Sequence, residues 1–526
     1  NIAYCPGPTD VIAIPMVAVS DPAAGLGLSV VLSPEDLIQD ITLQTDPSGD
    51  MIFSRYYHRI VKSNPVSFSL DLVPHRPDWR GGLAWMCNRY GDYFTPVNDS
   101  LAFELNGTSA YACNNGRDFD AQKMKDMAFS TNWRASFDFP YMGMFIPPVK
   151  DIDTGWKTYR GDTITVRAMN DYAETMKKQG FHVLSYFNLN EFGTGIQYPA
   201  PAPTTADESL WWQNSNDYLY GKLADAMLYI PEGMNPAGHY TKNFKGGPYY
   251  TWGDGVVMDC GVDSYKRFLM EQVRRHLDWL PAADGFCIDR YDWWHYFNEK
   301  YDDGMTWFEG KPVRSLNNSL RGFMQEFLPM VHEAGKAVYV NTHTKRLDLL
   351  KGIDGIHDEY TYREGALNTT AWLALKKPAL GWTDSRKDIK AQGVDNFFQK
   401  YLLMGVFPMC PFPGNDHSIR PDPWVDRAYL DYGPLMKPMK YRTWVLSSDP
   451  VSVAGDQAKA NVFEVPDGYI VPVVYATANR VKVSLPVVDA AGKWKVEAWY
   501  PGETAPVTLE ATSQEGVFAL DVPVRR

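Results

Sequence analysis

Short apolar segments alternate with helix-length amphipathic segments along the middle of this chain, from about residue 131 to residue 446. Such alternation is typical of βα units, which build a parallel sheet or a barrel. Besides a strand near 226–230, the expected strands cover residues 136–145, 181–188, 285–289, 337–341, 355–359, 380–384 and 405–410. The pattern therefore predicts an α/β protein built on a (β/α)8 TIM barrel, with Asp289 at the end of the fourth strand.

Both ends of the chain carry a different pattern, in which every second residue is apolar. Residues 67–73 (SFSLDLV) and 481–485 (VKVSL) are examples, and this alternation predicts half-buried antiparallel strands. At 526 residues the chain is long enough for about three domains. We expect an N-terminal β-sandwich over 1–130, the barrel over 131–446 and a small C-terminal β-sandwich over 447–526.

Charge and motifs exclude several classes of function. The net charge is −12 and no run of Lys or Arg forms a basic stripe, so a nucleic acid partner is disfavoured. No H-E-x-x-H, C-x-x-C, Walker or dinucleotide-binding motif occurs in a suitable context, so neither a metal nor another cofactor is expected. No apolar run reaches the roughly 18 residues that a membrane-spanning helix needs.

The first residue of the sequence is Asn1 and not Met. Removal of a leader peptide would leave such a start, so we expect an exported protein, located in the periplasm, at the cell surface or outside the cell. The N-x-[ST] sequons at Asn98, Asn106, Asn317 and Asn368 would be glycosylated only in a eukaryotic secretory pathway.

The segment Gly285–Asp289 (GFCID) carries the clearest indication of chemistry. A short apolar run ends in a carboxylate, and aromatic and charged residues follow at once. In a (β/α)8 barrel, reactive side chains gather at the C-terminal ends of the strands. A carboxylate in that place suits glycoside hydrolysis, with neighbouring aromatic rings stacked on the sugar. We therefore expect Asp289 to be a catalytic nucleophile; the alternative is that it caps the next helix or pairs with Arg290.

A retaining glycosidase needs a second carboxyl group about 5–5.5 Å from the first. The expected sixth strand offers Asp358 and Glu359, which are neighbours and so face opposite sides of the strand. Only one of them can point into the mouth of the barrel. We place the acid/base at Asp358, with Glu359 as the alternative and Asp384 of the next strand as the reserve.

Other polar and aromatic residues follow the expected strands or lie in their loops. They would bind sugar hydroxyls or stack on sugar rings, although each alone could be a cap, an ion-pair partner or a core residue. The expected substrate-binding residues are Asp138, Asn190, Glu191, Trp252, Arg290, Asp292, Trp293, Asn341, His343, Lys345, Trp382 and Asp384. The expected partner is accordingly an oligosaccharide or polysaccharide substrate.

A long insertion covers residues 194–250 and is rich in Pro, Gly, Tyr and Trp. Loops of this length in a compact domain are usually functional, and exposing many large rings to water is unfavourable. We expect the insertion to form one wall of the cleft and to close its far side, which would make the enzyme exo-acting. The alternative is that its rings pack on the barrel helices.

The layout resembles glycoside hydrolase clan D, the α-galactosidase and α-glucosidase superfamily. Asp289 in GFCID matches the position of that clan's nucleophile, and Asp358 in Gly355–Asp358 (GIHD) matches its acid/base. The resemblance implies a retaining, exo-acting α-glycosidase without a cofactor. Cys287 stands where many α-galactosidases have Lys, and residues 341–344 (NTHT) replace their Cys- and Gly-rich motif. An inverting glycosidase or a non-catalytic glycan-binding barrel remains the alternative.

Overall fold

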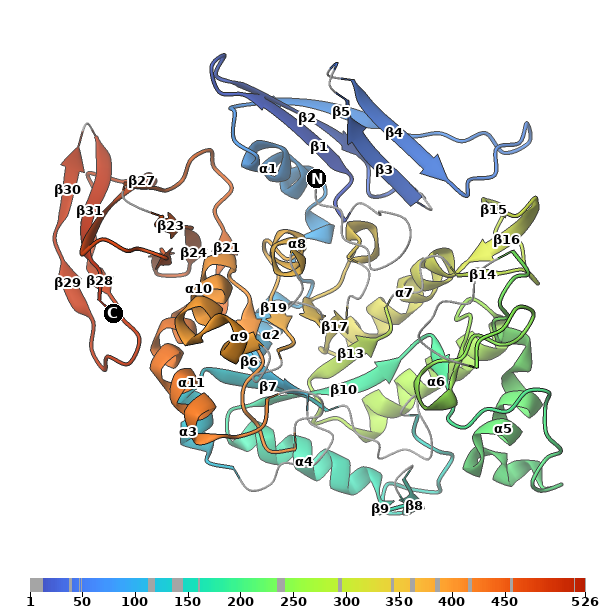
Figure 1. Ribbon diagram of the computed structural model, residues 1–526. Coiled ribbons are helices and arrows are strands. Elements are labelled where there is room, and N and C mark those ends of the chain that lie inside the picture. The colour runs from blue at the N-terminus through green and yellow to red at the C-terminus, as the bar shows by residue number, and fades with distance from the viewer. Residues whose placement is uncertain are drawn as a thin grey trace.

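The computed structural model describes most of the chain. The described residues are 13–36, 40–46, 48, 50–111, 119–134, 145–158, 161–233, 242–291, 296–341, 345–359, 365–383, 388–414, 419–454, 457–514 and 516–525. Eight strands of these ranges form one parallel sheet at the centre of the molecule (Figure 1). In sheet order they are β6 (Thr108–Tyr111), β7 (Phe129–Arg134), β10 (His182–Asn188), β13 (Gly285–Asp289), β17 (Ala337–Asn341), β18 (Gly355–Asp358), β19 (Ala379–Gly381) and β20 (Phe407–Pro408).

The sheet closes on itself at its two edge strands. Ser109 of β6 forms a parallel bridge with Met409, and the backbone N–H of Cys410 donates to the carbonyl of Ser109 at 2.6 Å. Gly285 begins β13 where the backbones come very close, because a Cβ at this position would lie 1.9 Å from the carbonyl oxygen of Ala337. The predicted (β/α)8 TIM barrel is confirmed.

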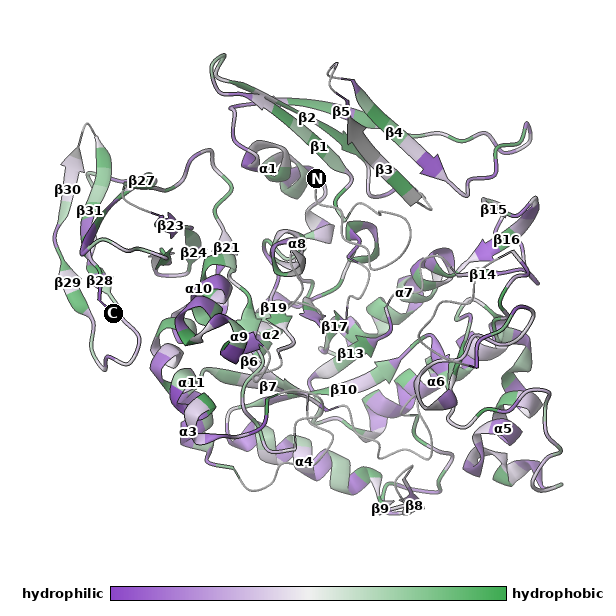
Figure 2. Cartoon of the chain, in the orientation of Figure 1, coloured by the Kyte–Doolittle hydropathy of each residue, from purple (hydrophilic) through white to green (hydrophobic). Residues whose placement is uncertain are grey.

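Amphipathic helices cover the outside of the barrel, and Figure 2 shows green and purple faces along several of them. In α4 the buried residues Val166, Met169, Ala173 and Met176 follow the three- and four-residue spacing of one helix face, and Thr165 caps the helix. The barrel helices are α2 (Asp99–Leu105), α3 (Ala121–Asp126), α4 (Val166–Lys178), α6 (Asp263–Trp279), α7 (Leu316–Glu333), α8 (Ala366–Leu373), α10 (Val394–Met404) and α11 (Pro423–Met436).

Antiparallel sheets precede and follow the barrel in the chain. At the N-terminus, β1 (Met16–Asp21), β2 (Leu26–Leu32) and β5 (Leu70–His75) form one sheet and β3 (Asp40–Thr45) pairs with β4 (Met51–Tyr56). Val17, Val30, Leu32 and Ile41 form a core between them, and α1 (Arg80–Arg89) leads to the barrel. The C-terminal domain is built on β22 (Ser452–Ala454), β27 (Arg480–Asp489), β31 (Val517–Pro523) and β30 (Ala511–Gln514).

Shorter strands complete the C-terminal region, where β27 contributes Val481, Val483 and Leu485 to a separate core. These strands are β21 (Thr443–Trp444), β24 (Phe463–Val465), β25 (Gly468–Ile470), β23 (Lys459–Ala460), β26 (Val473–Val474), β28 (Val496–Ala498) and β29 (Val507–Leu509). In Figure 1 the N-terminal sheets lie above the barrel and the C-terminal sheets lie to its left. None of the described helices is both long enough and apolar enough to cross a membrane.

The barrel begins earlier in the chain than the sequence pattern indicates. Both β6 and β7 precede or span residue 131, where we expected the barrel to start, so the first barrel strand lies inside the range assigned to the N-terminal sandwich. Residues 226–230 are not a barrel strand, because Met227 bridges Met258 and Tyr229 bridges Pro248 in antiparallel fashion within the insertion. Most of the expected strand 136–145 lies outside the described residues. Short apolar runs do not distinguish barrel strands from other buried segments.

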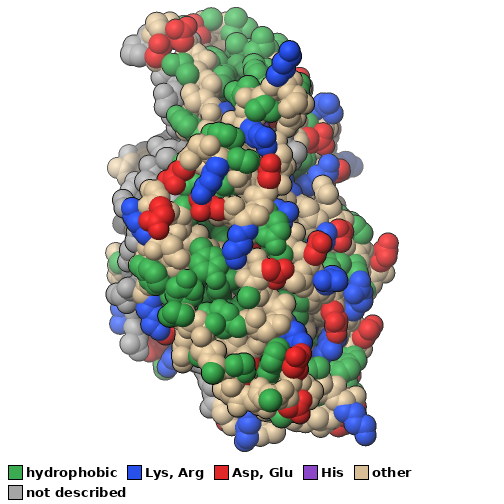
Figure 3. Space-filling model, turned by 90° about the vertical axis from the view of Figure 1, so that its right-hand side faces the viewer, with side chains coloured by type: hydrophobic (Ala, Val, Ile, Leu, Met, Phe, Trp, Pro, Cys, Tyr) green, Lys and Arg blue, Asp and Glu red, His purple; other side chains and the backbone are tan. Residues whose placement is uncertain are grey.

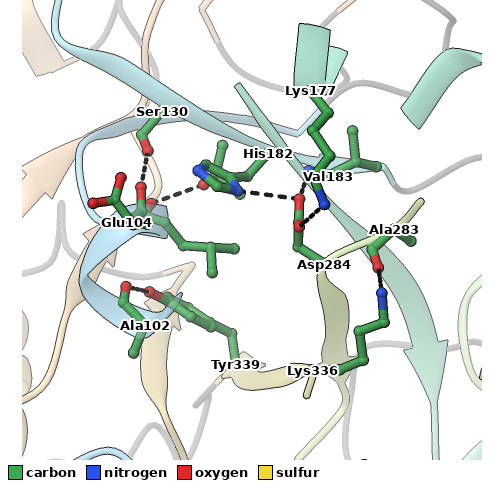
Figure 4. A network of polar contacts seen from close by, with 12 residues as sticks. Ala102, Glu104, Ser130, Lys177, His182, Val183, Ala283, Asp284, Lys336 and Tyr339 are labelled. Atoms are coloured by element: carbon green, nitrogen blue, oxygen red, sulfur yellow. Dashed lines mark hydrogen bonds and ion pairs between the residues drawn. The ribbon is translucent and has the colours of Figure 1, made fainter. Parts of the chain in front are cut away.

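A polar network joins the elements at the N-terminal end of the barrel (Figure 4). Asp284, just before β13, accepts hydrogen bonds from Nδ1 of His182 at 3.1 Å and from the backbone of Val183 at 3.3 Å, and it pairs with Lys177 at 3.6 Å. Burial by itself raises the pKa of Asp284, but the contacts with His182, Lys177 and the backbone of Val183 outweigh it and hold the pKa below its usual value. The charged Asp284 therefore stabilises this end of the fold.

Candidate active site

Two carboxylates share one amide nitrogen at the C-terminal ends of the barrel strands. The side chain of Asn341, the last residue of β17, donates through Nδ2 to Oδ1 of Asp289 at 2.8 Å and to Oε2 of Glu359 at 3.0 Å. These two oxygens lie no further apart than the sum of those distances, 5.8 Å.

Strand alternation brings these side chains together, since successive residues of a strand face opposite sides. On β13, Phe286 packs outward on α7, with ring centroids 5.5 Å apart, so Asp289 does not share its side and points into the barrel. On β18, His357 packs inside the barrel against Trp133 of β7 at 4.7 Å. Glu359 follows His357 by two residues and therefore points to the same side.

The second contact of Asp289 comes from β10. The hydroxyl of Tyr186 donates to Oδ2 of Asp289. Burial, and next to it the charge of Asp289, raises the pKa of Tyr186 well above its usual range, so the hydroxyl remains a protonated donor. Among the described residues, the hydrogen-bond partners of Asp289 are thus one hydroxyl and one amide, both uncharged. In the part of the chain that the structure describes, uncharged donors therefore orient both oxygens of Asp289.

The network continues from Tyr186 towards the turn after β13. Nδ2 of Asn188 donates to the Tyr186 hydroxyl at 3.2 Å and to Oε2 of Glu191 at 2.8 Å. Glu191 pairs with Nε of Arg290 at 3.4 Å, and the carbonyl of Arg290 accepts from Nδ2 of Asn190 at 3.1 Å. Arg290 has a φ of 53°, a left-handed conformation that residues other than glycine rarely adopt. These contacts hold the backbone immediately after Asp289 in a fixed turn.

Aromatic rings form a floor beneath the carboxylates. Trp133 stacks on Tyr186 with centroids 5.7 Å apart, and Trp382 lies 4.5 Å from Tyr111 of β6. His357 belongs to the same layer, at 6.1 Å from Trp382. Burial lowers the pKa of His357 to about 4, against the opposing effect of the nearby carboxylates. His357 is therefore a neutral ring at neutral pH, and the floor of the site carries no positive charge from it.

Asp358 lies on the opposite side of β18 from Glu359. Its Oδ2 pairs with Nζ of Lys345 at 2.5 Å and accepts a hydrogen bond from the hydroxyl of Thr370 on α8. The side chains of Asp358 and Lys345 are both 0% exposed. An ion pair of this kind is closed off from the mouth of the barrel, and loss of either partner would leave an uncompensated buried charge.

The structure assigns places to most of the residues expected at the site. Trp252 lies in η5 (Trp252–Asp254), just after the insertion, and is 37% exposed. Lys345 forms an ion pair with Asp358. Five expected residues lie outside the described ranges, namely Asp138, Asp292, Trp293, His343 and Asp384. Those that meet in one network or line its floor are Asp289, Glu359, Asn190, Glu191, Arg290, Asn341 and Trp382.

Five members of the site were not among the expected catalytic or substrate-binding residues: Tyr111, Trp133, Tyr186, Asn188 and His357. The alternation of side chains along a strand could have indicated two of them, because residues two apart face the same side. Tyr186 precedes Asn188 by two residues, and His357 precedes Glu359 by two. Trp133 could not be found in this way, because the sequence pattern placed no strand at residues 129–134.

No metal centre is formed by the described residues, since no group of three or more His, Cys, Asp or Glu side chains among them could hold an ion. Cys287 precedes Asp289 by two residues on β13, so its side chain lies on the same, inner side of the strand. Burial, followed by the charge of Asp289, raises the pKa of Cys287 well above its usual value. The thiol is therefore protonated at neutral pH and poorly suited to nucleophilic attack.

The insertion leaves the barrel at the same end as the carboxylates, because it follows the C-terminal residue of β10. At its base β11 (Glu191–Phe192) pairs with β12 (Val256–Val257). It contains η2 (Glu208–Gln213), α5 (Ser215–Tyr218), η3 (Leu219–Leu223) and η4 (Ala224–Ala226), at the right of Figure 1. Figure 3, which faces this side, shows a cluster of hydrophobic side chains. Exposed rings of the insertion include Tyr198 and Phe244, and Trp252 follows just after it.

Solved structures match this fold, whereas no protein-family model and no curated protein matches the sequence. A cycloalternan-degrading enzyme from Trueperella pyogenes aligns over 97% of this chain and 74% of its own, with a TM-score of 0.51 and 11% identity. The same enzyme in complex with a covalent intermediate aligns over 98% and 71%, with a TM-score of 0.52 and 11% identity.

A Paenibacillus sp. cycloisomaltooligosaccharide glucanotransferase, complexed with cycloisomaltoheptaose, is similar over nearly the full length of both chains. The alignment covers 97% of this chain and 96% of that one, with a TM-score of 0.52 and 8% identity. At such low identity the likeness establishes a common fold, in which the flanking sheets are included as well as the barrel.

Proposed function

We propose that this protein is a retaining glycosidase that acts on α-linked sugars, with Asp289 as the nucleophile and Glu359 as the acid/base. The observation that carries the proposal is the shared amide of Asn341, which holds Oδ1 of Asp289 and Oε2 of Glu359 at most 5.8 Å apart. Retaining glycosidases separate their carboxyl groups by about 5–5.5 Å, whereas inverting ones need about 6.5–9.5 Å to admit a water molecule.

The geometry supports a two-step displacement. In the first step an oxygen of Asp289 bonds to the anomeric carbon while the glycosidic C–O bond breaks, and Glu359 gives its proton to the departing oxygen. In the second step Glu359 takes a proton from water, the water oxygen bonds to the anomeric carbon and Asp289 leaves. Tyr186 and Asn341 keep the Asp289 oxygens oriented throughout.

The choice of Glu359 over Asp358 follows from their surroundings. An acid/base must reach the glycosidic oxygen and exchange its proton with water during each turnover. Asp358 is fully buried, and its Oδ2 contacts Lys345 and the hydroxyl of Thr370 on α8. Glu359 is partly exposed and shares the amide that binds the nucleophile.

The class of substrate is inferred from the fold and the site together. The two named enzymes that share the fold act on or bind cyclic oligosaccharides by their descriptions, and one of them is described with a covalent intermediate. The resemblance to clan D and the insertion at the catalytic end support an exo-acting α-glycosidase, with the insertion as a wall of the cleft. An exported location agrees with a large sugar substrate.

The test is the stereochemistry and the identity of the product. We would incubate the protein with aryl α- and β-glycosides of glucose and galactose and with isomalto-oligosaccharides, and follow the first-formed anomer by proton NMR. We expect turnover of an α-glycoside and release of a single terminal sugar as the α-anomer. Release of the β-anomer from an α-glycoside would mean inversion, internal cleavage products would rule out exo action, and no turnover of any glycoside would favour a binding barrel.

A further inference from the structure

A second groove lies in the N-terminal domain, outside the candidate active site. It has a volume of 760 Å³, within the range of ligand-binding clefts. The connection between β4 and β5, residues 57–69, forms most of its wall. Its lining includes Arg55, Tyr56, Tyr57, His58, Ile60 and Phe68.

Large side chains of this groove face solvent. Tyr56 is 50% exposed, Phe68 is 57% exposed and Ile60 is 79% exposed. The guanidinium of Arg55 lies 5.0 Å from the ring centroid of Phe68 and 3.6 Å from Asp36. Arg55 thus supports Phe68 from one side. Exposed planar rings held in this way are costly to leave in water, and they mark a binding surface more often than a structural one.

The wall of the groove is fixed to the catalytic end of the barrel. Backbone hydrogen bonds join Arg59 to Met305 at 2.7 Å and Trp307 to Tyr57 at 2.8 Å. Asn64 at the tip of the connection donates to the carbonyl of Gly304 at 2.8 Å. The partners at 304–307 belong to β15 (Thr306–Phe308) and its preceding turn, in the loop that follows Asp289.

The ring of Tyr57 also packs against the loop that follows Asp289. It lies 5.2 Å from the ring of Phe297 and 5.8 Å from that of Phe308. Phe297 follows Asp289 by eight residues, so the chain cannot separate the two by more than about 29 Å. The groove is therefore within reach of a long substrate whose end is bound at Asp289.

We propose that this groove binds a neutral oligosaccharide chain, remote from the bond that is cleaved. Tyr56 and Phe68 offer flat surfaces for the C–H faces of sugar rings, and the Tyr56 hydroxyl and Lys62 offer donors to sugar hydroxyls. The net charge of −12 disfavours an acidic polymer. The proposal rests on the proposed function only in taking the ligand to be a sugar.

The experiment measures binding without turnover. An Asp289→Asn protein is run in native gels that contain dextran, glycogen, galactomannan or, as the acidic polymer, alginate. We expect at least one neutral polymer to retard it, and about tenfold weaker retardation when Tyr56→Ala and Phe68→Ala are added. Trp424→Ala and Trp494→Ala, which also remove exposed rings, should leave the retardation unchanged. Tyr56→Ala alone provides a milder variant should the double variant fold poorly.

Retardation that is insensitive to both Tyr56 variants, or retardation by alginate alone, would overturn the proposal, as would the absence of retardation by every neutral polymer. Hydrolysis of a small aryl glycoside by the otherwise wild-type protein should not change in the Tyr56→Ala variant. If no glycoside is hydrolysed and yet a neutral polymer retards the protein in a manner that depends on Tyr56, sugar binding by the groove is supported and the proposed glycosidase activity is not.

Discussion

The strand β13 has an aspartate at each end, and the two are held in opposite ways. Asp284, before the strand, is bound by His182 and Lys177 at the N-terminal end of the barrel. Asp289, the last residue of the strand, is bound by the hydroxyl of Tyr186 and the amide of Asn341. The first carboxylate has a cationic partner in Lys177, whereas the described hydrogen-bond partners of the second are uncharged.

This difference separates the structural end of the barrel from the reactive one. A carboxylate paired with cations stabilises the fold, but its charge is already compensated. A carboxylate held by neutral donors keeps its charge for a carbon that becomes positive in the transition state. The same contrast distinguishes Asp358, which is paired with Lys345, from Glu359, which binds the amide of Asn341.

The largest expected effect is that of Asp289→Asn. The substitution should lower kcat on an α-glycoside by a factor on the order of 10⁴ or more, because the covalent step loses its nucleophile. Its thermal unfolding should change little. Asp284→Asn is the matched control at the other end of β13, and it should lower stability while preserving most of the activity. If Asp289→Asn lowers mainly stability and Asp284→Asn lowers mainly activity, the contrast between the two ends of β13 is wrong.

The second largest effect is expected for Glu359→Gln, which should lower kcat by a factor on the order of 10²–10⁴ for glycosides with poor leaving groups. Substrates with an activated leaving group such as dinitrophenol need no protonation and should lose far less. Added azide should restore turnover by taking the place of the activated water. If Glu359→Gln slows both kinds of substrate equally and Asp358→Asn shows the selective loss, then Asp358 is the acid/base.

Asp358→Asn is expected to act on stability, since it leaves Lys345 buried without its partner. The cost should be about 3–5 kcal/mol in the free energy of unfolding, measured by denaturant titration. Adding Lys345→Met to Asp358→Asn should recover part of this loss, because the unpaired charge is removed. A fully stable Asp358→Asn protein would contradict the view that this pair is structural.

The pH dependence of stability sharpens the comparison at Asp284. The pKa of Asp284 is lowered in the folded protein, so its stabilising contribution is complete above the pKa of the unfolded chain, about 3.9, and is lost as the pH falls through the folded value. Asp284→Asn should therefore be less stable than the wild type by about 2 kcal/mol at pH 6. The difference should shrink in acid, and a difference that stays constant down to pH 2 would contradict this account.

The smallest effect expected is that of Tyr186→Phe. Loss of the hydroxyl removes one of the two donors that orient Asp289, and we expect kcat/KM to fall about tenfold. Tyr172→Phe removes another buried hydroxyl, which accepts from Asn132, and serves as the control. Equal losses of activity in the two variants would mean that Tyr186 acts through packing alone.

Much of the barrel was predictable because its later strands are short apolar runs that end in polar residues. Residues 285–289, 337–341 and 355–358 are strands where we expected them. The expected position of Asp289 at the end of the fourth strand is correct for a partly accidental reason. The pattern missed β6 at 108–111 and β7 at 129–134, and it counted strands at 136–145 and 226–230 in their place. Thr108–Tyr111 is only four residues long, and a run of that length carries almost no periodicity.

By itself the sequence determined the class of fold, the antiparallel flanks and the carboxylate at the end of β13, because these depend on local periodicity and on the abrupt end of an apolar run. It could not decide between Asp358 and Glu359. The contacts with Lys345, Thr370 and Asn341 place the two side chains on opposite sides of β18, and our proposal that Glu359 is the acid/base rests on this difference. Those partners are 12 to 18 residues away along the chain, and only the packed structure brings them within hydrogen-bonding distance.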